Sequence, residues 1–221
     1  MAHSPPSIPW VEKYRPSDFD SIILNNYNRT ILENVIRSDF HVNLLFYGPP
    51  GTGKTTTIIN MIKRYNKRNH CSNGLVMHLN ASDDRGIELI RNQLYAFVNT
   101  SNLFTTGKKI IVLDEADYMT KLAQQALKLL IEQYNYNIRF VIICNYITKI
   151  DKSLQNIMMH MRFNNLPKAA IIQYLQQICT AEGIHVGNRH IERIQQRFDY
   201  DIRSMINYMQ FNFIDIAPPH P

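Results

Sequence analysis

The sequence predicts an α/β fold, in which helices flank a parallel sheet and a small helical domain follows. Between residues 43 and 162, short apolar runs alternate with segments of helical periodicity, which is typical of βαβ units. A glycine-rich segment follows the first apolar run directly, as a strand-to-helix turn would. Beyond residue 167 the periodicity is helical, with no strand pattern between the helices.

The apolar runs are the expected strands, and the segments between them are the expected helices. The strands are predicted at 43–47, 75–79, 109–113 and 140–144, with a shorter fifth at 161–163. The helices are predicted at 55–65, 86–98 and 120–133, and Thr120 is the expected N-cap of the third. In the third helix, apolar residues recur at helical spacing, so we expect its apolar face to contain Leu122, Ala126, Leu129 and Leu130.

The change of pattern near residue 167 places a domain boundary there. We expect an α/β domain over 1–166 and a small helical domain over 167–213, with helices at 168–182, 189–198 and 202–211. Residues 214–221 are the expected tail, because three prolines near its end do not continue a helix.

Composition excludes several classes of protein. The chain has 221 residues, of which 45% are hydrophobic and 19% charged, so it is neither disordered nor collagen-like. Its three cysteines are far apart and lack paired metal-ligand spacing. No apolar run approaches the ~18 residues of a membrane span, and the first residues do not resemble a signal peptide. We expect a soluble intracellular protein without a membrane partner. Its net charge of +6 suits a polyanionic partner but does not by itself indicate one.

The glycine-rich segment matches the phosphate-binding loop pattern at every required position. It lies between a predicted strand and a predicted helix, where backbone N–H groups and the helix N-terminus bind phosphate. Lys54 is expected to reach the β- and γ-phosphates of a nucleotide, and the Thr55 hydroxyl to bind Mg²⁺. The candidate nucleotide-binding residues are Gly48, Pro49, Pro50, Gly51, Thr52, Gly53, Lys54, Thr55 and Thr56.

Polar residues follow the third and fourth strands, at the sheet edge where ligands bind. Asp114 and Glu115 come 60 and 61 residues after Lys54 and directly after four apolar residues. Asp114 is expected to hold the Mg²⁺ shell, and Glu115 to act as general base toward water. Asn145 ends the fourth strand and is expected to sense the nucleotide, although an asparagine there is also a common turn residue.

Several segments occur in an order that resembles a known family. They are Trp10-Val-Glu-Lys-Tyr-Arg-Pro16, the phosphate loop, Leu79-Asn-Ala-Ser-Asp-Asp-Arg-Gly86, Leu113-Asp-Glu-Ala-Asp117, Gln124-Gln-Ala-Leu127 and Ile143-Cys-Asn-Tyr146. They resemble the small subunits of the clamp loader replication factor C, an AAA+ ATPase. The resemblance covers residues 10 to about 211.

The resemblance implies further site residues and partners. Tyr14, Arg15 and Pro16 would lie beside the adenine of ATP, Asn145 matches the first sensor, and Arg203 matches the second. The implied cofactors are ATP and Mg²⁺. The implied partners are other clamp-loader subunits, a sliding clamp and primer–template DNA, in the nucleus or at a viral replication site.

Contacts to these partners are expected near the second helix. Arg85 and Arg91 are candidates for the DNA backbone, although Arg91 could equally be a solvated helix arginine. Leu103 and Phe104 fall in the family's clamp-facing region, so they could contact a clamp. They could equally be buried residues that anchor a loop.

Two departures from the family pattern leave an alternative open. Where the family has a Ser-Arg-Cys triplet, this sequence has Asn156-Ile157-Met158, so we expect the chain to accept an arginine finger but supply none. The sequence also ends before the family's collar domain. The alternatives are a non-catalytic AAA+ assembly module or another AAA+ DNA-processing motor.

Overall fold

The computed structural model describes residues 8–69, 75–82, 88–100 and 108–213. These form two compact units. The sheet unit comprises Leu24–Pro49 and Lys54–Asn164. The helical unit comprises Met1–Ile23, Pro50–Gly53 and Asn165–Pro221. The boundaries predicted at 166 and 213 remain predictions.

The sheet unit contains five parallel strands in the order β2-β3-β4-β1-β5. They are β1 (Leu44–Tyr47), β2 (Val76–Asn80), β3 (Lys109–Asp114), β4 (Ile138–Cys144) and β5 (Met159–Arg162). Every residue of β4 is buried, whereas the edge strands β2 and β5 are partly exposed. Central strands covered on both faces are expected to be continuously apolar, which is why these runs could be read from the sequence. All five predicted strands are confirmed, with bounds that differ by one or two residues.

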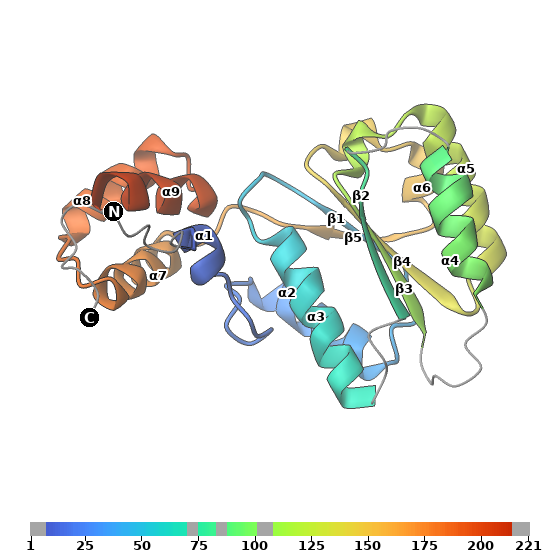
Figure 1. Ribbon diagram of the computed structural model, residues 1–221, viewed down its shortest axis with the longest axis horizontal. Coiled ribbons are helices and arrows are strands. Elements are labelled where there is room, and N and C mark those ends of the chain that lie inside the picture. The colour runs from blue at the N-terminus through green and yellow to red at the C-terminus, as the bar shows by residue number, and fades with distance from the viewer. Residues whose placement is uncertain (1–7, 70–74, 83–87, 101–107, 214–221) are drawn as a thin grey trace, which may run out of the picture. The chain divides into compact units, whose positions relative to one another are not determined.

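Helices cover both faces of this sheet (Figure 1). On one face lie α2 (Asn26–Arg37) and α3 (Lys54–Asn69), and on the other α4 (Tyr95–Asn99), α5 (Lys121–Tyr134) and α6 (Lys152–Gln155). A π-helical segment, Leu89–Leu94, leads into α4. Single 3₁₀ turns, Ala116–Tyr118 and Ile147–Lys149, follow β3 and β4. The predicted α/β fold, a parallel sheet flanked by helices, is therefore confirmed for the described residues.

The expected N-cap of α5 is confirmed. Its expected apolar face is confirmed for Leu130, which is buried, and for Ala126, which packs against the core, but it was wrong for two leucines. The Thr120 side chain accepts a hydrogen bond from the Ala123 backbone N–H at 3.2 Å. Leu122 and Leu129, however, are 61% and 64% exposed. The buried face is instead formed by Ala123, Gln124, Leu127, Leu130 and Ile131. The helix carries leucines on two adjacent faces, and the face with Leu127 and Leu130 is the one that packs in the core of the sheet unit.

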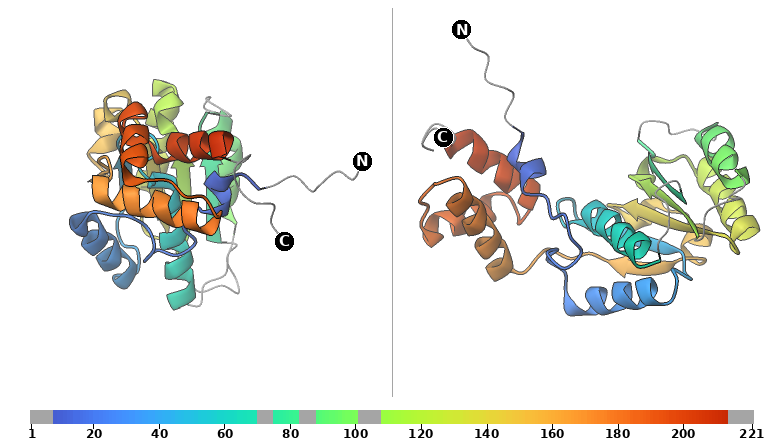
Figure 2. Two further views of the ribbon diagram at one scale, coloured as in Figure 1. Left: turned by 90° about the vertical axis from the view of Figure 1, so that its left-hand side faces the viewer. Right: turned by 60° about the horizontal axis from the view of Figure 1, so that its bottom comes forward.

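The helical unit has its own core. It contains α1 (Trp10–Lys13), α7 (Lys168–Ala181), α8 (Asn188–Arg197) and α9 (Ile202–Phe213), so the three predicted C-terminal helices are confirmed. Trp10 is 4% exposed and packs in one cluster with residues of α7, α8 and α9. The Trp10 backbone N–H also donates to Gln210 Oε1 at 2.9 Å. The N-terminal segment therefore packs with the C-terminal helices, although it precedes the first strand in the sequence (Figure 2).

Candidate nucleotide site

The glycine-rich loop joins β1 to α3, as the phosphate-binding pattern predicts. Gly48, Gly51 and Gly53 have φ angles of 143°, 72° and 85°, which residues with a side chain rarely adopt. At Gly48 the requirement is steric as well, because a Cβ would lie 2.0 Å from the Phe163 carbonyl oxygen. The loop conformation thus depends on glycine at these positions.

Lys54, the first residue of α3, is held at the end of this loop. Lys54 is buried, with only 7% of its surface exposed. The ammonium group donates to the carbonyl oxygens of Gly48 and Pro49, both at 2.8 Å, and to Asn145 Oδ1 at 2.9 Å. All three of these acceptors are neutral, so they orient the ammonium without cancelling its charge. An oriented, buried cation beside a glycine-rich turn suits an anionic ligand.

Thr55 and Asp114 meet in the same unit. The Thr55 hydroxyl donates to Asp114 Oδ2 at 2.6 Å. Asp114 is the last residue of β3, and its other oxygen, Oδ1, accepts from the Glu115 backbone N–H at 2.9 Å. Hydroxyl and carboxylate oxygens are ligands that Mg²⁺ prefers, so the donor set fits this ion.

Glu115 adopts an unusual backbone conformation. Its φ and ψ angles are 54° and 35°, in the left-handed region. For a residue that is not glycine, such a conformation costs about 1–3 kcal/mol and persists where the surroundings enforce it. Glu115 lies between the end of β3 at Asp114 and the start of the 3₁₀ turn at Ala116, so the chain changes direction at this residue.

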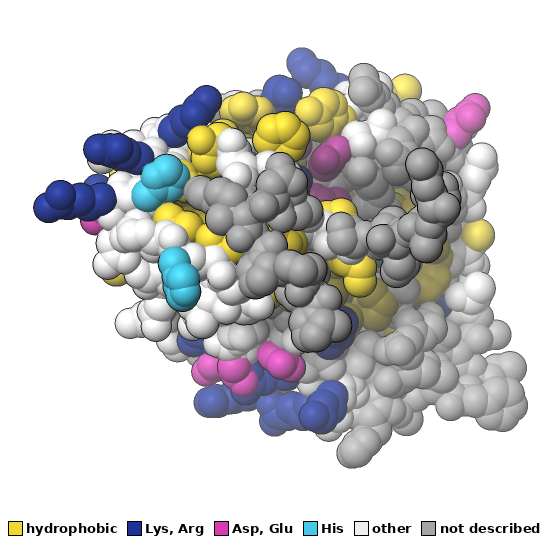
Figure 3. Space-filling model, turned by 60° about the vertical axis from the view of Figure 1, so that its left-hand side comes forward, with side chains coloured by type: hydrophobic (Ala, Val, Ile, Leu, Met, Phe, Trp, Pro, Cys, Tyr) yellow, Lys and Arg dark blue, Asp and Glu magenta, His cyan; other side chains and the backbone are white. Residues whose placement is uncertain are grey.

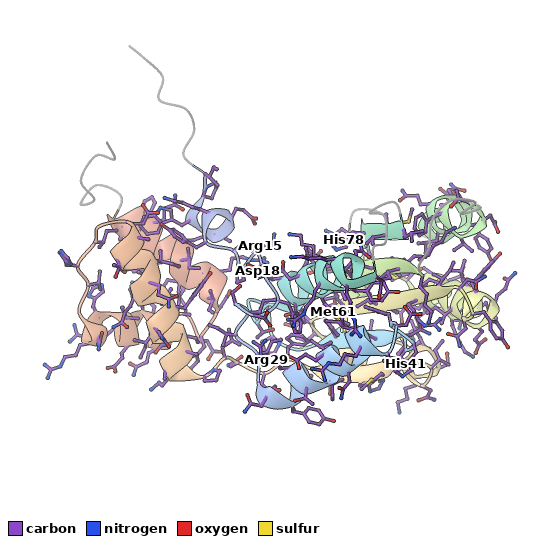
Figure 4. All side chains as sticks on the ribbon, turned by 90° about the horizontal axis from the view of Figure 1, so that it is seen from below. Arg15, Asp18, Arg29, His41, Met61 and His78 are labelled. Atoms are coloured by element: carbon purple, nitrogen blue, oxygen red, sulfur yellow. The ribbon has the colours of Figure 1, made fainter. Side chains whose placement is uncertain are left out.

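Two residues near these carboxylates were not selected as site residues from the sequence. Asp117 is 7% exposed, and its Oδ1 accepts from the Asn145 backbone N–H at 3.4 Å, which links the ends of β3 and β4. His78 lies on β2, and its Nε2 atom is 3.9 Å from Asp114 Oδ2 (Figure 4). Asp117 belongs to the motif that begins at Leu113 and could have been found there. His78 becomes a neighbour of Asp114 only through the β2–β3 pairing, for which the sequence gives no signal.

Cys144, between the site and the sheet core, is chemically protected. Burial raises the pKa of its thiol to about 12, a rise that the negative charge of Asp117 adds to and the positive charge of Lys54 opposes. A thiol in this state is a poor nucleophile at neutral pH. Cys144 and Cys179 are buried free cysteines.

The remaining predicted nucleotide contacts lie in the helical unit. The Tyr14 hydroxyl donates to Glu182 Oε1 at 2.5 Å, and Lys13 Nζ lies 2.8 Å from the same oxygen. Arg15 contacts Glu12 at 3.2 Å. Arg203 is exposed in the first turn of α9. The contribution of Tyr14, Arg15, Pro16 and Arg203 to a nucleotide site remains a prediction.

The predicted DNA and clamp contacts are less well defined. Arg85, Leu103 and Phe104 lie outside the described residues. Arg91 lies in the π-helical segment before α4. Their roles stay predictions.

The chain is similar to known proteins along most of its length. It is 37% identical to replication factor C subunit 3 of Schizosaccharomyces pombe over 97% of the chain, and 38% identical to replication factor C subunit 3 of Saccharomyces cerevisiae over 92%. Identity to replication factor C subunit 5 of Homo sapiens is 37%, also over 92%. The chain spans 66%, 59% and 60% of the length of these relatives.

A solved structure and a family model agree on the fold. A Thermotoga maritima RuvB variant matches with a TM-score of 0.70 at 14% identity, over 91% of this chain and 65% of that one, which supports the fold alone. Residues 44–166, which contain the loop, Asp114, Glu115 and Asn145, match the model of the ATPase family associated with various cellular activities. The chain therefore belongs to the AAA family.

Proposed function

We propose that this chain is an ATP-binding and ATP-hydrolysing clamp-loader subunit, which takes part in loading a sliding clamp onto primer–template DNA. The observation that carries the proposal is the convergence of Lys54, Thr55, Asp114 and Asn145 at one edge of the sheet. The similarity to replication factor C subunits supports the choice of clamp loading among AAA functions. The proposed partners are other loader subunits, a sliding clamp and DNA, at sites of DNA replication.

The residues divide the work of phosphoryl transfer to water. Backbone N–H groups of the loop and Lys54 would bind the β- and γ-phosphates, and Thr55 and Asp114 would hold Mg²⁺. When bound, Mg²⁺ neutralises charge on the phosphate oxygens. Glu115 accepts the proton of the attacking water, and Asn145 orients the Lys54 ammonium, to which it is already hydrogen-bonded.

Hydrolysis is proposed to need a neighbouring subunit. Ile157 packs against the core of the sheet unit. Its hydrocarbon side chain carries no charge, so the chain gives no arginine finger from this position. An arginine finger supplied in trans is worth about 10³–10⁵ in rate, so the isolated chain should turn over slowly.

ATPase measurements with and without partner subunits test this proposal. We expect slow hydrolysis by the chain alone, stimulation by replication factor C partner subunits, and loss of both in Glu115→Gln. Fast hydrolysis that needs no partner would contradict the shared-site model.

A second candidate is a non-catalytic assembly module, and the hydrocarbon side chain of Ile157 favours it. In this case nucleotide would be bound for structure only. Glu115→Gln separates the two, because it keeps the shape of the side chain but removes the general base. If the loading activity of the assembled complex is unchanged by Glu115→Gln, the module is structural. An AAA motor of another kind would instead reveal itself by separating DNA strands.

A further inference from the structure

We propose a second anion-binding site on the sheet unit, in a basic groove between α2 and α3, where the phosphate backbone of nucleic acid binds. The groove is an open hollow of about 430 Å³. It is lined by Glu33, Ile36, Arg37, Arg64, Lys67 and Arg68. This inference deepens the proposed function and rests on it for the choice of DNA as the ligand.

The groove lies at the opposite end of α3 from the phosphate-binding loop. Lys54 is the first residue of this 16-residue helix, whereas Arg64 and Arg68 lie in its last two turns. At 1.5 Å per residue the helix spans about 24 Å, so the groove is separate from the nucleotide site. Figure 4 shows α2 beside α3, with Arg29 near the beginning of α2 and His41 just beyond its end.

A side-chain hydrogen bond and a ring contact join the two helix ends that form the groove. The Tyr65 hydroxyl on α3 donates to Asp39 Oδ1, two residues after α2, at 2.6 Å. The Tyr65 ring packs edge-on against Phe40 with centroids 5.7 Å apart, and both residues are fully buried. Ile36, at 4% exposed, closes the floor. The basic side chains therefore project from a rigid base.

Charge on α3 has one sign. The helix carries Lys54, Lys63, Arg64, Lys67 and Arg68, and no aspartate or glutamate. Like charges at i,i+4, as in the pairs 63/67 and 64/68, cost about 0.2–0.5 kcal/mol each. Favourable interaction with the helix dipole accounts for the last turn but not for Lys63 and Arg64, one turn earlier. In the space-filling view of Figure 3, Lys and Arg side chains occur in separate groups, some of them beside acidic side chains.

The acidic residue of the groove neutralises little of this charge. Glu33 Oε2 lies 3.8 Å from Arg37 Nη2, and the Arg37 side chain is 69% exposed. Exposed pairs of this kind are worth about 0–1 kcal/mol. The lining residues thus comprise four cationic side chains and one carboxylate, a formal charge of +3 that suits an anionic ligand.

Charge density favours nucleic acid over an acidic protein. Residues 63–68 extend about 7.5 Å along the helix axis. Duplex DNA presents one negative charge per about 1.7 Å, or about four over this length. An extended acidic peptide presents at most one per about 3.3–3.6 Å. Arginine guanidinium groups also bind phosphate oxygens bidentately.

A matched pair of double variants tests the site. Arg64→Ala/Arg68→Ala removes two exposed arginines at i,i+4 from the groove. Arg189→Ala/Arg193→Ala removes two exposed arginines at the same spacing from α8, so the net charge of the two variants is equal. Binding of a fluorescein-labelled primer–template DNA to the full chain is followed by anisotropy between about 50 and about 200 mM salt, with thermal unfolding as the check of folding.

We expect the groove variant to bind DNA about tenfold or more weakly at low salt, with the slope of log K against log salt reduced by about 1.8 for two lost phosphate contacts. The α8 variant should bind as the wild type does, and both should bind ATP normally. Equal DNA binding by the two variants would overturn the inference, as would no DNA binding by the wild type or equal competition by polyglutamate. These three outcomes concern the groove only and do not test ATP binding or hydrolysis. Failure of the wild type to bind ATP would instead refute the proposed function.

Discussion

The Thr55 hydroxyl lies 2.6 Å from Asp114 Oδ2, although 59 residues separate them in the sequence. One is in the first turn of α3 and the other is the last residue of β3. The strand that leads into α3 is β1, and β1 is not adjacent to β3 in the sheet, because β4 lies between them. The two oxygens meet because α3 starts at the carboxyl edge of the sheet, where β3 also ends. This places two candidate Mg²⁺ ligands side by side.

Replacing Lys54 should abolish tight nucleotide binding. In Lys54→Ala the ammonium group that Gly48, Pro49 and Asn145 orient is lost. A charged hydrogen bond is worth about 1.5–3 kcal/mol, which corresponds to about 10- to 150-fold weaker ATP binding in a titration. Lys63→Ala, on an exposed position of the same helix, is the control and should bind ATP as the wild type does. Equal affinities of the two variants would remove Lys54 from the site.

Gly48 should be intolerant of any side chain. In Gly48→Ala the new Cβ meets the Phe163 carbonyl oxygen at 2.0 Å, and φ is 143°. Backbone strain and overpacking each cost about 1–3 kcal/mol, so denaturant unfolding should show a loss of about 2–6 kcal/mol. Gly187 offers the matched control, because its φ is −70° and a Cβ there meets nothing within 4 Å. Gly187→Ala should change stability by less than about 1 kcal/mol. Similar losses in both variants would contradict the steric account.

The helical unit should lose stability at alkaline pH through Tyr14. Burial, followed by the hydrogen bond to Glu182, raises the pKa of the Tyr14 phenol above its usual value of 10.0. Above pH 10 the unfolded chain therefore releases this proton before the folded chain does, and the balance moves toward unfolding. The Lys13 pKa is also raised, mainly by its hydrogen bond to Glu182, and acts in the same direction above pH 10.5.

Tyr14→Phe isolates the contribution of the phenol. At pH 8 the wild type should be more stable than this variant by about 1 kcal/mol, the value of a hydrogen bond. The difference should shrink as the pH rises from about 9 to about 11, because only the wild type carries the titrating group. Thermal unfolding of both proteins measures it. A difference that stays constant across this range would show that Tyr14 does not titrate between the two states.

The sequence predicted the strands that are buried along their whole length, but it did not predict which helix face is buried or which residues meet across the sheet, because tertiary packing determines these. Strand β4 is buried along its whole length, so its apolar run identifies it without further information. For α5, the sequence shows leucines on two faces, and only packing reveals that Leu129 is exposed and Leu130 is buried. Asp117 acquires its contact with the Asn145 backbone because β3 and β4 are neighbours in the sheet, a pairing that no local pattern specifies.

Titration calorimetry of the folded chain with ATP, in the presence and absence of Mg²⁺, tests the central assignment most directly. Lys54, Thr55 and Asp114 form one site if the wild type binds one ATP, Mg²⁺ strengthens the binding, and Asp114→Asn loses this Mg²⁺ dependence while still binding ATP. A well-folded wild type that takes up no ATP with or without the metal would contradict the nucleotide site and the proposed function built on it.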